Sequence, residues 1–595
     1  MIGSHRIQRI MLAVVFVVLA PLSLFAQESP QSSRYTISLA NAAKHLISIK
    51  IELPAGLAER NLQLPVWYAL YQIRDFSQYI NWVHSSTPIK KIDKSEWRIA
   101  GAENGATIEY EIFADDAGPF GAQLNSHHAF FNLAEILMYP TDDRDSPMQI
   151  HFINVPTDWR VGTTLRPSGD GFAAHNYDEL ADSPVEISAF DETDFDQDGG
   201  HYRVIVDAAH GDYDTSKIMA MLQDVVHAEV SWMADRPFDT YLFIYHFPRD
   251  SEGGGMEHAY STAIDLRQSM MQSDPHALQE ISAHEFFHLW NVKRIRPQSL
   301  EPPDYTKENY TDALWFSEGF TSTVENYMLL RAKLLDKREY FAHLAAEIED
   351  LENRPAHLTQ SAEESSIDTW LEKYSYYRRP DRSVSYYEKG ELLGVMLDLD
   401  IRSLTGGNRS LRDMFQWMNV NYAQKSVAFA DSEGVRQAAE TITRSNLAPF
   451  FDKYVSGTDE IPWNVFFKTV GLNLITEKAE LPDVGFTASR NFDSPLTVNS
   501  VDENSAAQIA GLSNGDVILE VNGEPPGIDF ASTMKGVRPG ENLTLRTRNG
   551  KGERELSWKV NTRQELEFRI TEQDNLTPQQ KTRRAAWLKA ESEQP

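Results

Sequence analysis

Two histidines lie four residues apart in the segment 283–297, AHEFFHLWNVKRIRP, within an apolar pattern of helical period. On a helix, His284 and His288 share one face and are one turn apart, so both imidazoles can reach one ion. A hydrolytic zinc site needs three protein ligands and one open position. Glu285 lies beside the first histidine, where it can take a proton from water. A helix with two partly exposed histidines gives the same pattern. A third ligand is therefore needed to distinguish a zinc site from such a helix.

Glu318 is the candidate for that ligand. It lies in a second amphipathic helical pattern at 311–330, among the aromatic residues of LWFSEGF. An unpaired buried carboxylate is costly, and a metal ion would supply the positive partner. The alternative is an exposed glutamate in a first helical turn, where the helix dipole favours it. We predict one Zn²⁺ ion per chain on His284, His288 and Glu318, with Glu325 exposed or in a supporting position, and we expect Gly319 to let the two helices approach closely.

A glycine-rich strand upstream, GGMEHAYST at 254–262, can meet a peptide. Glycine permits close backbone approach, so a substrate chain can add to this strand as a new edge. Glu257 can then hold the free α-ammonium group of the peptide. We predict a substrate-binding strand of Gly254, Gly255, Met256 and Glu257; the alternative is a glycine-rich hairpin with an exposed glutamate.

Two adjacent tyrosines follow downstream in SVSYYEKGELLG. Ser385 and Glu388 have the spacing of a capping box, which places Tyr387 in the first turn of a helix. The partial positive charge at that helix end would help a phenol to donate to a developing oxyanion. Tyr386 is the second candidate for this role, and a purely structural pair of tyrosines is the alternative.

The four stretches HEFFHLWNVKRIRP, LWFSEGF, GGMEHAYST and SYYEKGELLG together resemble the glycyl aminopeptidase family. Those proteins are gluzincin zinc metallopeptidases related to the aminopeptidase N family, and the resemblance covers most of the chain. It implies a thermolysin-like catalytic domain in which Glu285 is the base. It further implies that Glu257 holds the substrate amine, that Tyr387 stabilises the tetrahedral intermediate, and that small N-terminal residues such as glycine or alanine are removed.

The chain departs from the wider aminopeptidase N pattern in two places. The stretch between His288 and Glu318 is longer and contains KRIRPQSLEPPDY, and His258 replaces the asparagine of the GxMEN pattern. The glycyl aminopeptidase relatives share both features. The cationic side chains of this insert are hydrogen-bond donors without a free lone pair, so they are not expected to bind zinc. We expect them to brace the metal helix; pairing with acidic residues of the same domain and lining the substrate cleft are the alternatives. These cations are Lys293, Arg294 and Arg296.

At 595 residues the chain exceeds a single hydrophobic core. Short alternating runs between about residues 34 and 167 predict a β-sandwich-like region, and helical patterns dominate from about 311 to 454. The predicted fold class is therefore multidomain α+β. We predict a signal peptide at 1–26, an N-terminal β-sandwich-like domain at 27–175, a thermolysin-like zinc catalytic domain at 176–345, a helical continuation completing the active site at 346–465, a PDZ-like domain at 470–562 and a polar C-terminal tail at 563–595.

The first 26 residues have a short basic start, an apolar stretch interrupted by Pro21, and the small residue Ala26 before a polar segment. This order is that of a secretory signal peptide, and the apolar part is short for a bilayer span. An uncleaved anchor is the alternative. The chain has no cysteine, so it folds without disulfides. We predict an exported protein, in a bacterial periplasm, with no stable membrane span once the signal is removed.

The segment GLSNGD at 511–516, with ENSAAQIA before it and VILEVNG after it, resembles the PDZ fold. Val484, Gly485 and Phe486 lie where such domains place a carboxylate-binding loop. We predict that they hold the C-terminal carboxylate of a peptide. The alternative is a PDZ-like domain that only packs against the catalytic domain.

A net charge of −31 argues against nucleic acid or anionic lipid as a partner, because those ligands need basic surfaces. The expected partners are peptides with a free N-terminus. Two other functions stay open: a PDZ-guided zinc endopeptidase or processing protease, and a catalytically silent peptide-binding protein. The presence of Glu285 and Tyr387 weighs against the second, since a binding scaffold needs neither a base nor an oxyanion donor.

Overall fold

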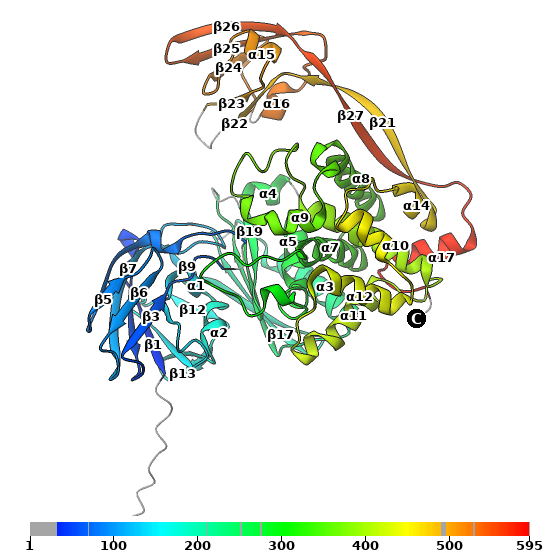
Figure 1. Ribbon diagram of the computed structural model, residues 1–595. Coiled ribbons are helices and arrows are strands. Elements are labelled where there is room, and N and C mark those ends of the chain that lie inside the picture. The colour runs from blue at the N-terminus through cyan, green and yellow to red at the C-terminus, as the bar shows by residue number, and fades with distance from the viewer. Residues whose placement is uncertain are drawn as a thin grey trace, which may run out of the picture.

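The computed structural model of the chain describes residues 32–593, apart from 69–70, 210, 250–252, 274–275, 490–494 and 528–529 (Figure 1). The predicted signal peptide lies outside the described residues. Among the helices that are described, none combines the length and the apolar character that crossing a bilayer requires.

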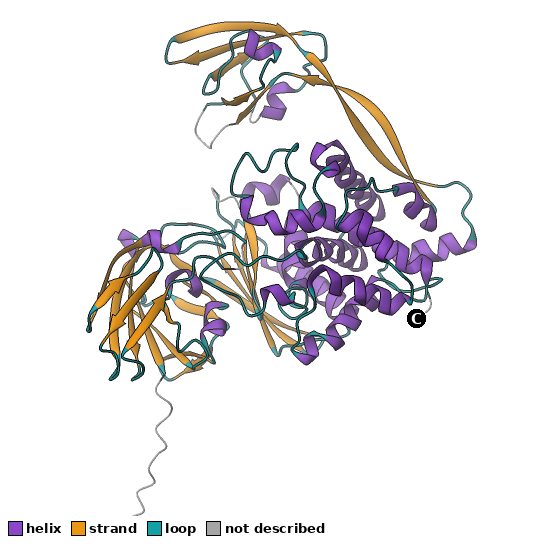
Figure 2. Cartoon of the chain, viewed as in Figure 1, coloured by secondary structure: helices purple, strands orange, loops and turns teal. Residues whose placement is uncertain are grey.

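The N-terminal domain consists of three β-sheets around one core (Figure 2). Their strand orders are β13-β14-β11-β1-β2-β7-β4, β10-β3-β6-β5 and β12-β15-β9-β8. Buried and more exposed residues alternate along β1 and β2, as expected for strands with one face on a core. The strands are β1 (Ser33–Asn41), β2 (Leu46–Leu53), β3 (Glu59–Gln63), β4 (Ile80–Ser85), β5 (Ile89–Lys91), β6 (Glu96–Ala100), β7 (Ala106–Phe113), β8 (Gln123–Leu124), β9 (His128–Asn132), β10 (Tyr139–Pro140), β11 (Met148–Ile153), β12 (Arg160–Thr163), β13 (Arg166–Ser168), β14 (Gly171–Ala174) and β15 (Pro184–Ser188).

The last strand of this domain extends it beyond the predicted boundary at residue 175. β15 pairs with both β9 and β12, so it belongs to the N-terminal domain. All five of its residues are buried, and they therefore show no alternation from which the sequence could assign them to a sheet with one exposed face.

The region after the N-terminal domain begins with a five-stranded sheet, whose strand order is β16-β17-β18-β20-β19. β17, β18 and β20 are parallel, and β19 is an antiparallel edge strand. One face packs on helices, and the other meets the N-terminal domain through a small cluster that includes Phe130, Ile205 and Ile244. Because both faces are covered, β18 is apolar almost throughout. The strands are β16 (Asp191–Gln197), β17 (Gly200–Asp207), β18 (Thr240–His246), β19 (Gly254–Glu257) and β20 (Ser261–Asp265).

The helices that cover this sheet continue without interruption past the predicted division at residue 345. A single hydrophobic core runs from the sheet through these helices, so the predicted catalytic and helical parts pack as one unit. The longer helices are α3 (Thr215–Met233), α5 (Ala277–Phe287), α7 (Gly319–Ala332), α8 (Lys337–Asn353), α10 (Tyr386–Leu404), α11 (Leu411–Asn421) and α12 (Asp431–Thr443); the shorter ones are α4 (Gln268–Ser273), α6 (Leu314–Ser317), α9 (Ala362–Ile367), α13 (Ala448–Phe450) and α14 (Trp463–Phe467).

The PDZ-like domain lies at the end of a two-stranded ribbon (Figure 1). β21 (Leu472–Asp483) and β27 (Asn561–Glu572) pair along their full lengths and lead to and from it. The domain has its own core and a sheet in the order β22-β23-β24-β25-β26. Its elements are β22 (Phe486–Ser489), β23 (Thr497–Val501), α15 (Ala506–Ile509), β24 (Val517–Val521), α16 (Phe530–Met534), β25 (Asn542–Asn549) and β26 (Gly552–Lys559).

The predicted polar tail at 563–595 is instead a structured return to the catalytic body. After β27, α17 (Pro578–Trp587) packs on the helices, and Trp587 is fully buried. Its Nε1 donates to the hydroxyl of Tyr327 at 2.8 Å, and Trp232 Nε1 donates to the carbonyl of Ala590 at 2.9 Å. The polar composition misled the prediction because a few side chains anchor the segment.

We expect Trp587→Ala to lower the free energy of unfolding of the catalytic body by about 3–5 kcal/mol, because it leaves a large buried cavity. Urea unfolding followed by far-UV circular dichroism measures this. The matched control is Trp82→Ala, since Trp82 is 37% exposed, and about 0.5 kcal/mol or less is expected there. Equal effects of the two substitutions would contradict a docked C-terminus.

Candidate active site and metal centre

The three predicted metal ligands converge from two neighbouring helical segments. α5 carries His284, and His288 caps its C-terminal end, while Glu318 lies at the junction of α6 and α7. Glu318 Oε2 is 3.5 Å from His284 Nε2 and 3.2 Å from His288 Nε2. Ligand atoms at about 2.0–2.2 Å from a tetrahedral zinc ion lie about 3.3–3.6 Å apart. The spacing of the three donor atoms and their chemistry therefore fit zinc.

The other ring nitrogen of each histidine is held by an oxygen atom. His284 Nδ1 lies 3.1 Å from Glu325 Oε2, and His288 Nδ1 lies 2.6 Å from the carbonyl oxygen of Asn291. Such acceptors fix the tautomer and leave each Nε2 free to bind a metal. Glu325 thus has the supporting position that was one of its two expected placements.

Glu285 lies against the edge strand of the sheet. The residue is 6% exposed, and its carboxylate Oε2 has no hydrogen-bond partner among the described residues. A Cβ atom on Gly255 would lie 2.2 Å from Glu285 Oε1, so only glycine lets β19 pass so close to this carboxylate. Burial raises the pKa of the Glu285 carboxyl above its ordinary range. A carboxylate with these properties is suited to accept a proton from water.

The strand predicted to bind substrate is the free edge of the five-stranded sheet. β19 pairs only with β20 in this sheet, and Glu257 is at its C-terminal end. Met256 is 1% exposed, and its side chain packs in the core of the N-terminal domain. It anchors the strand and can offer a substrate only its backbone.

The two tyrosines occupy different environments. Ser385 caps α10 by accepting a hydrogen bond from the Glu388 N–H, which places both tyrosines in the first turn. Tyr387 is 38% exposed, and its ring centroid is 6.1 Å from that of His284. Tyr386 is buried, with its hydroxyl 3.1 Å from Thr369 Oγ1. Tyr387 is therefore the one beside the metal ligands.

A close helix contact fixes this tyrosine relative to Glu318. A Cβ atom on Gly319 would lie 2.4 Å from the Cα atom of Gly390, so α7 and α10 touch through their glycines. Gly319 was expected to bring the Glu318 helix close to the metal helix α5. This expectation was wrong, because the helix that Gly319 contacts is α10, which carries the second glycine, Gly390.

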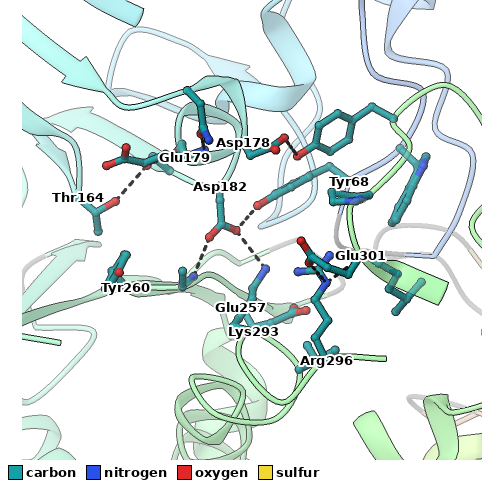
Figure 3. Close-up of a pocket in the computed structure, with 18 of the residues that line it drawn as sticks. Tyr68, Thr164, Asp178, Glu179, Asp182, Glu257, Tyr260, Lys293, Arg296 and Glu301 are labelled. Carbon is teal, nitrogen blue, oxygen red and sulfur yellow. Dashed lines mark hydrogen bonds and ion pairs between the residues drawn. The ribbon is translucent and has the colours of Figure 1, made fainter. Parts of the chain in front are cut away.

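A cavity of about 480 Å³ adjoins the site at Glu257 (Figure 3). Asp182 at its wall lies 3.0 Å from Lys293 Nζ and 3.3 Å from His258 Nδ1, and it accepts a hydrogen bond from Tyr68. Burial alone would raise the pKa of Asp182, but Lys293 and His258 outweigh it and hold this pKa well below its ordinary range. Asp182 and Tyr68 belong to the N-terminal domain, and no local pattern in the sequence marks them.

The cations of the insert brace the loop after the metal helix. Besides the Lys293 contact, Arg294 Nη1 donates to the carbonyl oxygen of Leu289 at 2.6 Å, and Arg296 pairs with Glu301 at 3.1 Å. Lys293 and Arg296 also line the cavity beside Glu257, so these two residues combine bracing contacts with a place at the cleft wall.

The predicted carboxylate-binding loop of the PDZ-like domain is only partly available. The Gly485 N–H donates to Asp483 Oδ1 at 3.1 Å. Phe486 is 3% exposed and packs against Phe530 and Trp558, so its side chain belongs to the domain core. Val484 is half-buried against the same core. β22 is an edge strand of the sheet that the described residues form, and its outer backbone edge is what remains for a peptide.

Comparison with known proteins identifies three regions. Residues 277–393 match the M61 glycyl aminopeptidase family, residues 34–189 match the Peptidase M61 N-terminal domain, and residues 497–547 match a PDZ domain. No curated protein matches the chain.

A solved structure with a high TM-score shows the same fold. An aminopeptidase N family protein from Idiomarina loihiensis is 24% identical, with a TM-score of 0.81 over 93% of this chain and 100% of that one. An M1 zinc metallopeptidase from Deinococcus radiodurans is 11% identical, with a TM-score of 0.45 over 73% of this chain and 95% of that one.

These matches confirm the predicted family resemblance and the multidomain α+β fold class with its β-rich N-terminal and PDZ-like domains. The chain is a peptidase that is similar to the M61 glycyl aminopeptidases over both its N-terminal and its peptidase regions.

Proposed function

We propose that this enzyme removes single residues from the N-terminus of peptides, with one catalytic zinc ion per chain on His284, His288 and Glu318. The observation that carries the proposal is the buried carboxylate of Glu285 beside the ligand histidines and the edge strand β19. Its Oε2 has no hydrogen-bond partner among the described residues. The preference for small residues such as glycine and alanine rests on the family resemblance.

The roles of the residues follow from their positions. When bound, zinc supplies a Lewis acid for the scissile carbonyl group and lowers the pKa of the attacking water. Glu285 takes the proton from that water and returns it to the leaving amine. Tyr387 donates a hydrogen bond to the carbonyl oxygen as negative charge develops there. Glu257, at the end of the edge strand, pairs with the α-ammonium group and so selects the free amino end.

We also propose partners and a cellular location for the enzyme. Peptides with a free N-terminus are the proposed substrates. A C-terminal peptide segment is the proposed ligand of the edge of β22, by strand addition. The N-terminal segment and the lack of cysteine support export to a periplasm, with the signal peptide removed.

Glu285→Gln is expected to reduce kcat on glycyl and alanyl chromogenic substrates by about 10²–10⁴-fold, because it removes the base and leaves the three ligands. Zinc content measured by plasma emission should stay unchanged. His288→Ala is the control, and it should lose both the catalytic zinc ion and the activity. Unchanged turnover in Glu285→Gln would overturn the proposed mechanism.

Tyr387→Phe is expected to lower kcat by about 10²–10³-fold with little change in KM, because the phenol acts as the oxyanion forms. Tyr386→Phe is the matched control, since that hydroxyl is buried against Thr369. The steady-state constants of both variants test the assignment. If the Tyr386 variant were the impaired one, the roles of the two tyrosines would be reversed.

A free peptide and its N-acetylated twin should differ sharply, because acetylation removes the charge that Glu257 pairs with. The wild-type enzyme should cleave only the free peptide. Glu257→Gln should lower kcat/KM for that peptide by about 10–100-fold. Chromatography of the products also reports which bond is cut, so equal cleavage of both peptides at an internal bond would establish an endopeptidase instead.

A further inference from the structure

A second histidine–carboxylate cluster lies where the N-terminal domain meets the catalytic sheet. His128 begins β9, Glu186 is in the middle of β15, and His246 ends β18. Two acidic residues flank His246 in register, Asp207 at the end of β17 and Asp265 at the end of β20. The carboxyl ends of three parallel strands therefore face the two strands of the neighbouring domain. None of these residues belongs to the catalytic centre.

The donor atoms of this cluster have the spacing of a metal site. Glu186 Oε2 is 3.1 Å from His246 Nε2 and 3.8 Å from His128 Nδ1. Asp207 Oδ2 is 3.1 Å from the same His128 nitrogen. The corresponding distances at the catalytic centre are 3.2 and 3.5 Å. His128, Glu186 and His246 each offer one donor atom, and these three atoms lie within 4.8 Å of one another. The same holds for the three predicted metal ligands His284, His288 and Glu318.

The ring nitrogens that face away from the cluster are both held by oxygen atoms. His246 Nδ1 lies 2.8 Å from Asp265 Oδ1, and His128 Nε2 lies 2.5 Å from Gln123 Oε1. Both oxygens are acceptors, so each of these nitrogens carries a proton. The opposite nitrogens, His246 Nε2 and His128 Nδ1, then turn toward Glu186. The catalytic histidines are held in the same manner by Glu325 and Asn291.

Two buried atoms of the cluster make no hydrogen bond of acceptable geometry among the described residues. They are His128 Nδ1, which has only the ion-pair contacts with Asp207 and Glu186, and Glu186 Oε1, whose side chain is fully buried. Burying such groups without hydrogen bonds is costly, and a cation between them would satisfy both. A small cavity of about 220 Å³, lined by His128, Asp207 and His246, gives an ion a path to the cluster.

We propose that His128, Glu186 and His246, together with Asp207, bind a second divalent transition-metal ion. Two imidazoles and two carboxylates suit zinc, and four protein ligands make a closed, structural site rather than a catalytic one. The ion would join β9 and β15 of the N-terminal domain to β18 of the catalytic sheet. Asp265, which orients His246, pairs in register with Gly254 of the substrate strand.

A metal-free ion-pair network is the competing explanation. Burial lowers the pKa of His128, but the carboxylates of Asp207 and Glu186 outweigh it and raise this pKa to about 9. In that case both histidines would be protonated, and the cluster would hold no ion. Metal stoichiometry separates the two explanations directly.

The test is the zinc content of the full chain, saturated with zinc and then freed of loosely bound ions by gel filtration. We expect about two ions per wild-type chain, and about one in each of Glu186→Gln, His128→Gln and His288→Ala. His227→Ala is the matched control, because His227 Nδ1 pairs with Asp198 at 2.9 Å on an exposed surface. It should keep both ions. A second ion that survives Glu186→Gln and disappears in His227→Ala would be adventitious and would overturn the proposal.

Cobalt spectroscopy keeps the proposal testable if a cluster variant folds poorly. In His288→Ala, Co²⁺ should still give the visible absorption of a tetrahedral site, and chelator should lower the melting temperature. The Glu186→Gln, His288→Ala double variant should show neither effect. A wild-type chain that binds only one ion in excess zinc, while remaining fully active, would refute the second site and leave the catalytic proposal intact.

Discussion

The rest of the catalytic body depends on the contact between the Glu318 carboxylate and two histidines of another helix. A buried carboxylate without a positive partner would cost several kcal/mol, so this contact constrains how α5 and α7 can pack. The glycine contact between α7 and α10 then fixes the Tyr387 helix relative to the same carboxylate. Gly255 lets the edge strand pass beside Glu285. Three elements are therefore positioned around one group of charged atoms.

The sequence predicts the residues whose spacing is local. His284 and His288 are one helical turn apart, and Glu257 and Tyr387 lie in short stretches with a glycine triplet or a helix cap. These residues meet in the structure because a helix or a strand carries each of them in a fixed direction. The burial of the Met256 side chain could not be predicted, since the pattern of β19 does not reveal that another domain covers one of its faces.

Contacts between remote segments could not be predicted in the same way. Asp182 and Lys293 are 111 residues apart in the sequence, and no pattern around either residue predicts the contact between them. β15 is assigned to the N-terminal domain only by its pairing with β9. The polar composition after residue 563 hides an anchored helix, because one buried tryptophan outweighs many exposed charges in fixing its position.

The two histidine clusters illustrate the same contrast. The catalytic pair is visible in the sequence because one helix supplies both rings. His128, Glu186 and His246 come from three strands in two domains, so no spacing rule connects them. Their common feature appears only in three dimensions, where each ring is held from behind by an oxygen and turned toward one carboxylate.

The ribbon of β21 and β27 has a mechanical consequence. Both of its strands are 12 residues long, which corresponds to about 40 Å at about 3.4 Å per residue. The PDZ-like domain is thus inserted between two strands that both return to the catalytic body. A double tether permits bending but prevents the free swivelling that a single linker allows. A peptide bound along the edge of β22 would therefore be held within a restricted range of positions relative to the catalytic body.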